Sequence, residues 1–231
     1  MSRRVTHPEP VPGASQVAVL PFLAAVEGYL RIGPELPGLR MTMHRVMSRL
    51  GAQYLQQVSP YVGSGGVTGF EKAGRTFAVN EGIMGAAFET GRIWRTAHFD
   101  NLDSLQAALQ ADMDGLGDTG PIADVAVSYL AIPLLSENGF PVLVFYADSK
   151  SLNYFADDER VTAIARMCQG FCRVIDDLQR SPVDKLKNFP LQEAEPYRGP
   201  PTVYKGLQEI FEGAVAPRFA FLQSFNFEAA A

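Results

Sequence analysis

The clearest pattern of hydrophobic and polar positions lies in residues 127–178. Two mostly apolar runs rich in β-branched and aromatic residues, 127–135 and 140–147, flank the turn sequence Ser-Glu-Asn-Gly at 136–139. Because Asn-Gly accepts the positive φ of a tight hairpin, the runs predict two antiparallel strands. Pro133 cannot donate to the strand ladder, so we expect it to face an edge or a bulge.

A long amphipathic helix is predicted after the second strand and ends at Ser181-Pro182. Asn153 and Asp157 are both possible N-caps, and acidic residues at 157–159 suit the positive end of the helix dipole. Apolar residues then recur at heptad spacing, which lets the helix cover a sheet on one side and still meet another helix. This seam comprises Val161, Ile164, Cys168, Phe171, Ile175 and Leu178.

The amino-terminal third predicts helices before the first strand. Residues 1–14 are rich in proline and resemble a mobile arm. A helix over 15–30, capped by Ser15, either begins near Pro21 or bends there. A second, methionine-rich helix over 39–50 and a strand over 52–62 follow.

Short elements fill the middle of the chain. A glycine cluster at 63–66 predicts a loop, because it lacks the order of a phosphate-binding motif. A short strand is expected at 76–79, and a helix over 82–91 with Gly91 as its C-cap. A strand over 92–97 and a helix over 101–113 complete this part.

The carboxyl-terminal segment differs in composition from the rest. Five prolines in 182–201 favour an extended strap, and 202–212 could form a short helix. Alternating aromatics in 219–227 would invite aggregation if exposed, so we expect them to dock on their own domain, the other subunit or a partner, with heteropartners less favoured. The predicted division is an arm at 1–14, a domain at 15–181 and a strap at 182–231.

Composition narrows the classes of protein. The 231 residues are 47% hydrophobic and 19% charged, which suits one sizeable folded domain with additions. A net charge of -5 and a pI near 5.3 give no general attraction to nucleic acid or to an anionic membrane. No apolar run is long enough to span a bilayer, and the amino terminus lacks a secretory apolar region. We therefore expect a cytoplasmic protein.

Cys168 and Cys172 lie four residues apart, on one face of the predicted helix. They could form a thiol pair for a soft metal or for redox chemistry, or be two small apolar residues in a buried stripe. No histidine or third cysteine lies nearby, which favours the buried stripe.

Four runs, in order and spacing, resemble the GAF domain, a small-molecule sensor fold related to the PAS domain. They match its glycine-bounded helix, its proline-containing strand, the next strand, and the aromatic-then-acidic opening of its last helix. The runs are Gly82 to Gly91, Ser128 to Leu134, Pro141 to Asp148, and Tyr154 to Glu159. The resemblance covers roughly residues 36–180.

The resemblance implies a mixed α+β fold: a GAF/PAS-like central antiparallel sheet of about five or six strands, with terminal helices on one face and a ligand pocket on the other. GAF domains bind cyclic nucleotides, bilins, haem, metabolites or nothing, and often dimerise through terminal helices. The heptad seam would suit such a homodimer. The Asn-Lys-x-Phe-x-Asp-Glu signature of cyclic-nucleotide binders and a pocket cysteine for bilin or sulfoxide-reductase chemistry are both missing. With no output domain in the sequence, a stand-alone module is expected.

Residues on the implied pocket side are candidate ligand contacts, each with a structural alternative. His98 could bind a ligand or haem, but a lone histidine is more often a surface residue. Aromatic packing in the sheet or core is the alternative for the others. The candidates are Phe77, Trp94, His98, Tyr129 and Tyr146.

No pattern supports catalysis or a metal site. Asp114, Asp118 and Asp124 lack the order of a calcium loop, and His7 and His44 fall in unrelated segments. We therefore predict a non-enzymatic sensory or regulatory module that binds a small organic ligand in an apolar pocket and acts as a homodimer. A protein-interaction scaffold with a filled pocket is the first alternative, and a redox enzyme of the GAF type is the second. The sequence leaves the ligand and any cofactor unknown.

Overall fold

A computed structural model of the chain describes residues 11, 13–31, 38–49, 51–63, 73–80, 82–112, 126–180, 191–195, 206–210 and 214–220. Within these residues the fold is mixed α+β, as predicted, with one seven-stranded antiparallel sheet. The helices are α1 (Gly13–Leu30), α2 (Gly82–Thr90), α3 (Leu102–Asp112) and α4 (Asp158–Arg180). In sheet order the strands are β3 (Thr76–Ala78), β2 (Ala52–Gln57), β1 (Arg40–Arg49), β6 (Pro141–Ser149), β5 (Ser128–Leu135), β4 (Trp94–Thr96) and β7 (Leu207–Glu209).

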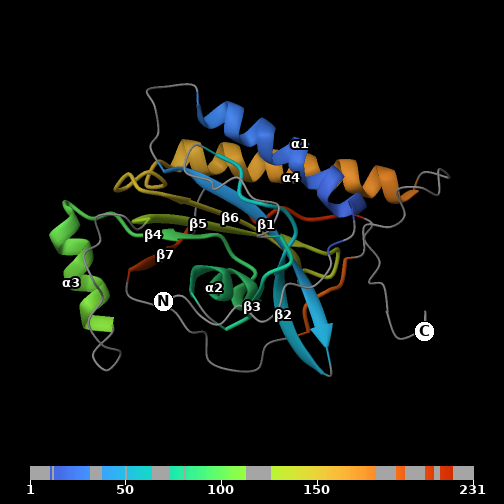
Figure 1. The fold of residues 1–231 in the computed structure, drawn as a ribbon, viewed down its shortest axis with the longest axis horizontal. Coiled ribbons are helices and arrows are strands. Elements are labelled where there is room, and N and C mark those ends of the chain that lie inside the picture. The colour runs from blue at the N-terminus through green and yellow to red at the C-terminus, as the bar shows by residue number, and fades with distance from the viewer. Residues whose placement is uncertain are drawn as a thin grey trace.

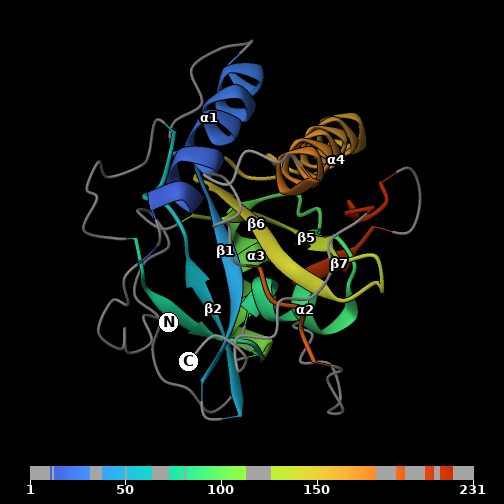
Figure 2. The ribbon, with the colours of Figure 1, turned by 90° about the vertical axis from the view of Figure 1, so that its right-hand side faces the viewer.

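The sheet separates two layers of helices. Figure 1 shows α1 and α4 lying together along one face, with α2 against the opposite face and α3 beside the β4 end of the sheet. The view in Figure 2, turned by 90°, agrees with this arrangement. We call the side under α1 and α4 the helix face and the side under α2 the α2 face.

The heptad seam of α4 lies in the core of the helix face. Its described side chains are all buried, and Phe171 packs against Phe22 of α1 with ring centroids 4.8 Å apart. The helix therefore covers the sheet and meets a second helix within a single chain. The side chain of Leu178 lies outside the described residues, and assembly into a dimer stays a prediction.

Local signals predicted the hairpin and the helix ends well. Gly139 has φ +87°, and the N–H of Ser136 donates to the carbonyl of Phe140 at 2.8 Å, which closes the β5–β6 turn. Pro133 lies just before a register irregularity at 134/135. Asp157 caps α4, because its Oδ1 accepts from the N–H of Glu159 at 3.0 Å.

The other predicted element boundaries shift by a few residues. α1 begins at Gly13, so Ser15 lies inside it, and Pro21 does not end it. Gly91, with φ +64°, follows α2 as predicted, and its N–H donates to Ala87. Asn153 is not the cap of α4; it has φ +59° and its side chain bonds the backbone of Phe99.

The predicted helix over 39–50 is wrong, because this segment is β1, the strand between β2 and β6. Its methionines and arginines are good helix formers, but pairing with two neighbours decides the backbone. Met41 and Met43, two residues apart, enter the core of the helix face, and the intervening Thr42 points to the other side. Gly51, with φ +77°, turns the chain into β2 and ends no helix. β2 stops at Gln57, and Val62 forms an isolated bridge to Met41.

The predicted helix over 202–212 is also wrong where the structure describes it. Residues 207–209 are β7, which pairs with β4 at the edge of the sheet. Phe219 is completely buried, so this aromatic residue docks on its own chain. Other predictions fall outside the described residues: the arm up to residue 10, the glycine loop from 64, the acidic loop 114–124, all five strap prolines, and the aromatics after residue 220.

Candidate functional site

Polar and aromatic side chains occupy one end of the α2 face. In the sheet register Arg40 of β1 lies beside Asp148 of β6, which lies beside Tyr129 of β5. Two residues further along β1, Thr42 is the partner of Tyr146. Since side chains two residues apart share a face, these groups form one surface. We call it the polar end, together with the adjoining side chains of His44, Gln57, Tyr61, Arg75 and Phe77.

Asp148 is the centre of the polar end. Arg40 binds its carboxylate with two hydrogen bonds, Nε to Oδ1 at 2.8 Å and Nη2 to Oδ2 at 2.7 Å. The hydroxyl of Tyr146 donates to the same Oδ2 at 2.9 Å. The carboxylate is fully buried, and its hydrogen bonds raise the pKa of Arg40. Burial, reinforced by Asp148, raises the pKa of Tyr146. This charge is therefore fully paired.

Two guanidinium groups stack on Tyr61. The Cζ atom of Arg40 lies 4.9 Å from the ring centroid, and that of Arg75 lies 5.5 Å away. Arg75 also lies over Phe77 at 5.6 Å, and its Nε donates to Oε1 of Gln57 at 2.9 Å. Such cation–π contacts hold charge where water is partly excluded. Among the described residues, Arg75 therefore contacts neutral side chains, whereas Arg40 is paired with the carboxylate of Asp148.

His44 is the most unusual residue of the α2 face. It is 0% exposed; one ring nitrogen approaches the backbone of Val144, but neither nitrogen makes a hydrogen bond of full geometry within the described residues. Its ring lies edge-on to Phe77 and Tyr146, with centroids 5.1 and 6.1 Å away. Burial, reinforced by the positive charge of Arg75, lowers the pKa of His44 to about 3. The imidazole is therefore neutral at physiological pH, with its N–H directed to the backbone of Val144 and its acceptor nitrogen unpaired among the described residues.

The structure brings three of the five predicted ligand contacts to the polar end. Phe77 and Tyr146 flank His44, and Tyr129 is the register partner of Asp148. The Tyr129 hydroxyl donates to the carbonyl of Ala126, and burial raises the pKa of Tyr129 to about 12. Their part in ligand binding stays a prediction.

The other two predicted contacts lie elsewhere. Trp94 packs under α2 in the apolar part of the face, and its Nε1 donates to Oγ1 of Thr90 at 2.8 Å. His98 follows β4 and is exposed. Trp94 therefore serves the packing of α2, as its structural alternative proposed.

Sequence reasoning missed most of the residues that make the polar end. The available signal was a charged residue near the end of an apolar strand. Asp148 is the last residue but one of one such strand, and Arg40 is the first residue of another. In the sequence His44 is a candidate metal ligand at most, and its segment is unrelated to that of His7. The missed residues are Arg40, His44, Gln57, Tyr61, Arg75 and Asp148.

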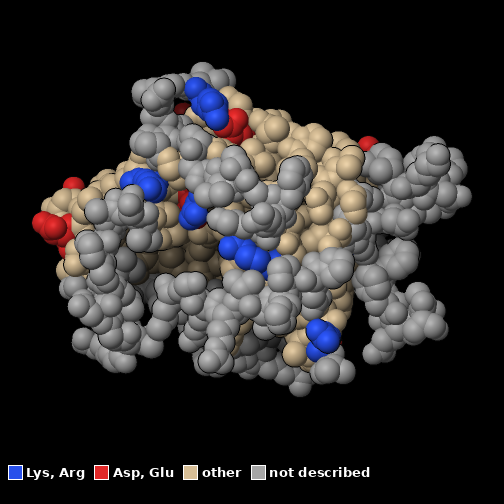
Figure 3. Space-filling view, in the orientation of Figure 1, with Lys and Arg blue, Asp and Glu red and all other residues tan. Residues whose placement is uncertain are grey.

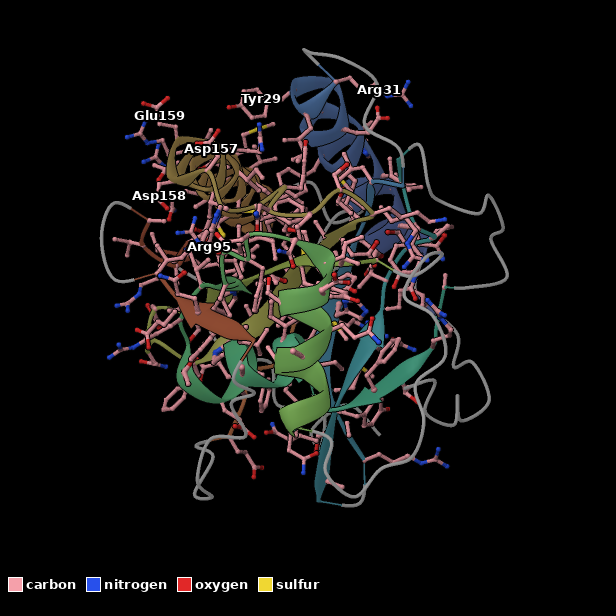
Figure 4. The ribbon with its side chains drawn as sticks, turned by 90° about the vertical axis from the view of Figure 1, so that its left-hand side faces the viewer. Tyr29, Arg31, Arg95, Asp157, Asp158 and Glu159 are labelled. Atoms are coloured by element: carbon pink, nitrogen blue, oxygen red, sulfur yellow. The ribbon has the colours of Figure 1, made fainter. Side chains whose placement is uncertain are left out.

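A second polar cluster joins β4 to the start of α4. Arg95 donates to the carbonyl oxygens of Phe155 at 3.1 Å and Ala156 at 3.0 Å, and its Nη1 lies 2.6 Å from Oδ1 of Asp158. Figure 4 shows Arg95 and Asp158 near each other, with Glu159 pointing away from them. Because Arg95 holds backbone carbonyls, we interpret this cluster as an anchor for α4.

Surface charge is distributed unevenly. In the space-filling view, basic side chains recur across the middle of the molecule, and acidic ones gather at the left over α3 (Figure 3). The chain as a whole carries a net charge of -5. Positive charge at the polar end is therefore a local property.

Metal and thiol chemistry find no support in the part of the chain that the structure describes. No three metal-ligating side chains meet there. Cys168 and Cys172 are completely buried, and burial raises the pKa of both thiols, so the reactive thiolate is disfavoured. None of the described helices combines the length and apolarity that crossing a bilayer requires.

Comparison of the chain with models of known protein families and with curated proteins gives no match. Membership of the GAF family therefore stays a prediction. The seven-stranded α+β fold is compatible with it, with α1 and α4 on one face of the sheet.

Proposed function

We propose that this chain is a cytoplasmic, non-enzymatic sensory or regulatory module of GAF-like type, which binds a small organic ligand on the α2 face and acts as a homodimer. One observation carries the ligand proposal: His44 is fully buried next to Phe77 and Tyr146, and within the described residues only the backbone of Val144 approaches its ring nitrogens. Buried polar groups are almost always hydrogen-bonded, so a buried ring nitrogen without a partner among the described residues supports the binding of a polar ligand group.

The chemistry of the polar end supports binding more than turnover. Asp148 is occupied by Arg40 and Tyr146, so its carboxylate is not available as a base. His44 is neutral, but no nucleophile among the described residues donates to it. The site we propose is also more polar than the apolar pocket expected from the sequence.

A scaffold with a filled pocket is the second candidate, and the packing under α2 favours it. There the α2 face is closed by side chains that are almost fully buried, among them Leu55, Phe88 and Trp94. In that case the molecule would act through protein contacts alone. The alternative of a redox enzyme is less favoured, because the thiols of both cysteines are buried.

Native mass spectrometry of the protein purified from its own host tests the proposal. We expect a dimer carrying one small adduct per subunit, released on mild unfolding. Replacing the buried imidazole, His44→Phe, should abolish the adduct. The control His98→Ala, which changes an exposed histidine, should retain it. A dimer without an adduct would favour the scaffold. A monomer without an adduct would in addition contradict the proposed homodimer.

A further inference from the structure

We propose that the ligand of the polar end is a small organic anion, whose oxyanion binds Arg75 and whose hydroxyl group donates to His44. Its apolar body then lies against the rings of Tyr61, Phe77 and Tyr146. This inference rests on the proposed function and adds the chemical class of the ligand. Three properties of the described residues support it: charge balance, unused hydrogen-bonding capacity and aromatic surroundings.

Charge balance favours an anion. The polar end holds two guanidinium groups, of Arg40 and Arg75, but the only carboxylate hydrogen-bonded to either among the described residues is that of Asp148. Arg40 uses that carboxylate bidentately, and Arg75 binds the neutral amide oxygen of Gln57. A partly buried cation without a counter-charge is costly, and a bound oxyanion removes that cost.

Hydrogen-bonding capacity points to the same position. Gln57 is the register partner of His44 and the acceptor for Arg75, so it joins the two. The neutral imidazole of His44 directs its N–H to the backbone of Val144, and its acceptor nitrogen has no partner among the described residues. A hydroxyl group on the ligand can donate to this nitrogen, while the oxyanion of the same ligand accepts from Arg75.

The surrounding rings favour an organic body over an inorganic ion. Tyr61 and Tyr146 lie with ring centroids 6.4 Å apart, and Phe77 lies on the other side of His44. Aromatic walls of this kind recover free energy by covering apolar surface. A hydroxylated aromatic carboxylate therefore combines the features that the polar end selects.

The test uses 3-hydroxybenzoate and its neutral isostere 3-hydroxybenzamide as probes of the intact protein. Binding is followed by calorimetry and by the imidazole nitrogen resonances, assigned to His44 with the variant His44→Leu. We expect the carboxylate to bind roughly 10-fold or more tightly than the amide, the factor for a charge-assisted hydrogen bond. The His44 resonances should shift as the carboxylate saturates the site.

Two variants locate the oxyanion. Arg75→Gln should weaken 3-hydroxybenzoate binding by roughly 10-fold or more and leave the amide unchanged. Arg75→Lys keeps the positive charge but lacks the paired N–H donors of the guanidinium, so it should have an intermediate effect. Arg31→Gln, at an exposed arginine on the helix face, is the matched control and should behave as the wild type.

Three results would overturn the inference: equal affinity for both probes, undiminished carboxylate binding in folded Arg75→Gln and Arg75→Lys, or no saturable binding of 3-hydroxybenzoate at millimolar concentration. A neutral adduct in native mass spectrometry, lost in His44→Phe, would refute the anion and leave the sensory function standing. Absence of both adduct and probe binding would remove both proposals.

Discussion

Burial decides what each charged residue of the polar end can do. The carboxylate of Asp148 is saturated by Arg40 and Tyr146, so it orders its neighbours and holds the ends of β1 and β6 together. Removing one partner of such a pair leaves an uncompensated buried charge, which is strongly destabilising. Arg75 has no such partner among the described residues, so the anion that we propose would bind Arg75 in preference to Arg40.

The buried neutral imidazole of His44 makes the stability of the unliganded protein depend on pH. Its pKa is lowered to about 3 in the folded state, and the unfolded chain titrates near the ordinary value of 6.5. Between these values the unfolded state binds more protons, so stability is lost as the pH falls from 6.5 towards 3. At about pH 5 the loss should be about 2 kcal/mol.

Urea unfolding of wild type and His44→Leu at about pH 7.5 and pH 5 measures this effect. The free energy of unfolding of the wild type, minus that of the variant, should decrease by about 2 kcal/mol on acidification. Taking the difference cancels the titration of other groups. The same cycle with His98→Leu should show little change, because His98 is exposed. A pH-independent difference for His44 would mean that the imidazole is solvated.

At the scale of single residues, the sequence predicted part of the candidate site. Aromatic residues in apolar strands, such as Phe77 and Tyr146, indicate a position in the sheet, and both lie at the polar end. The pair formed by Arg40 and Asp148 could not be predicted, since 108 residues separate them and only the strand register brings them together. Long-range pairing of this kind leaves no local periodicity.

Elements with strong local signals were predicted, and elements defined by pairing were not. The Asn-Gly turn at 138–139, the glycine-bounded α2 and the amphipathic α4 carry their own start and stop signals. β1 alternates polar and apolar residues over 40–44, but Val46 and Met47 break the alternation, and its methionines favoured a helix. β7 has only three residues and depends on β4 for its hydrogen bonds.

The N-cap of α4 offers a test at the scale of one element. Oδ1 of Asp157 accepts from the N–H groups of Glu159 and Arg160 at 3.0 and 3.2 Å. Asp157→Ala should therefore lower the free energy of unfolding by about 1 kcal/mol, the usual effect of losing such a cap. Asp177→Ala, at an exposed position far along the same helix, should change it by less than about 0.5 kcal/mol. Equal effects would show that the cap contributes nothing.

At the scale of the whole molecule, the carboxyl-terminal segments complete the domain. β7 extends the sheet beyond β4, and Ala194 donates to the carbonyl of Pro141 at 2.7 Å. Residues 214–220 lie between β5 and α4: Phe219 donates to Leu135 at 2.8 Å, and Gln169 of α4 bonds both backbone groups of Arg218. Folding of the sheet therefore involves segments far apart along the chain.

Phe219 is the side chain that joins this segment to the core. It is 0% exposed and belongs to the helix-face cluster, so Phe219→Ala should lower the free energy of unfolding by about 3–5 kcal/mol. Val215→Ala is the matched control, because Val215 is 84% exposed in the same segment, and it should cost less than about 0.5 kcal/mol. Urea unfolding followed by circular dichroism gives both values.

Hydrogen exchange then distinguishes global from local destabilisation. The amide of Ala220 donates to Asp176 at 2.8 Å, and that of Leu135 donates to Pro217 at 2.8 Å. If residues 214–220 fold with the sheet, both amides should exchange only through global unfolding in the wild type, and faster in Phe219→Ala. If the segment opens by itself, these two amides alone should lose protection while the central strands keep theirs. That second outcome would make the segment a separately folding strap, because its docking would contribute nothing to the cooperative stability of the sheet.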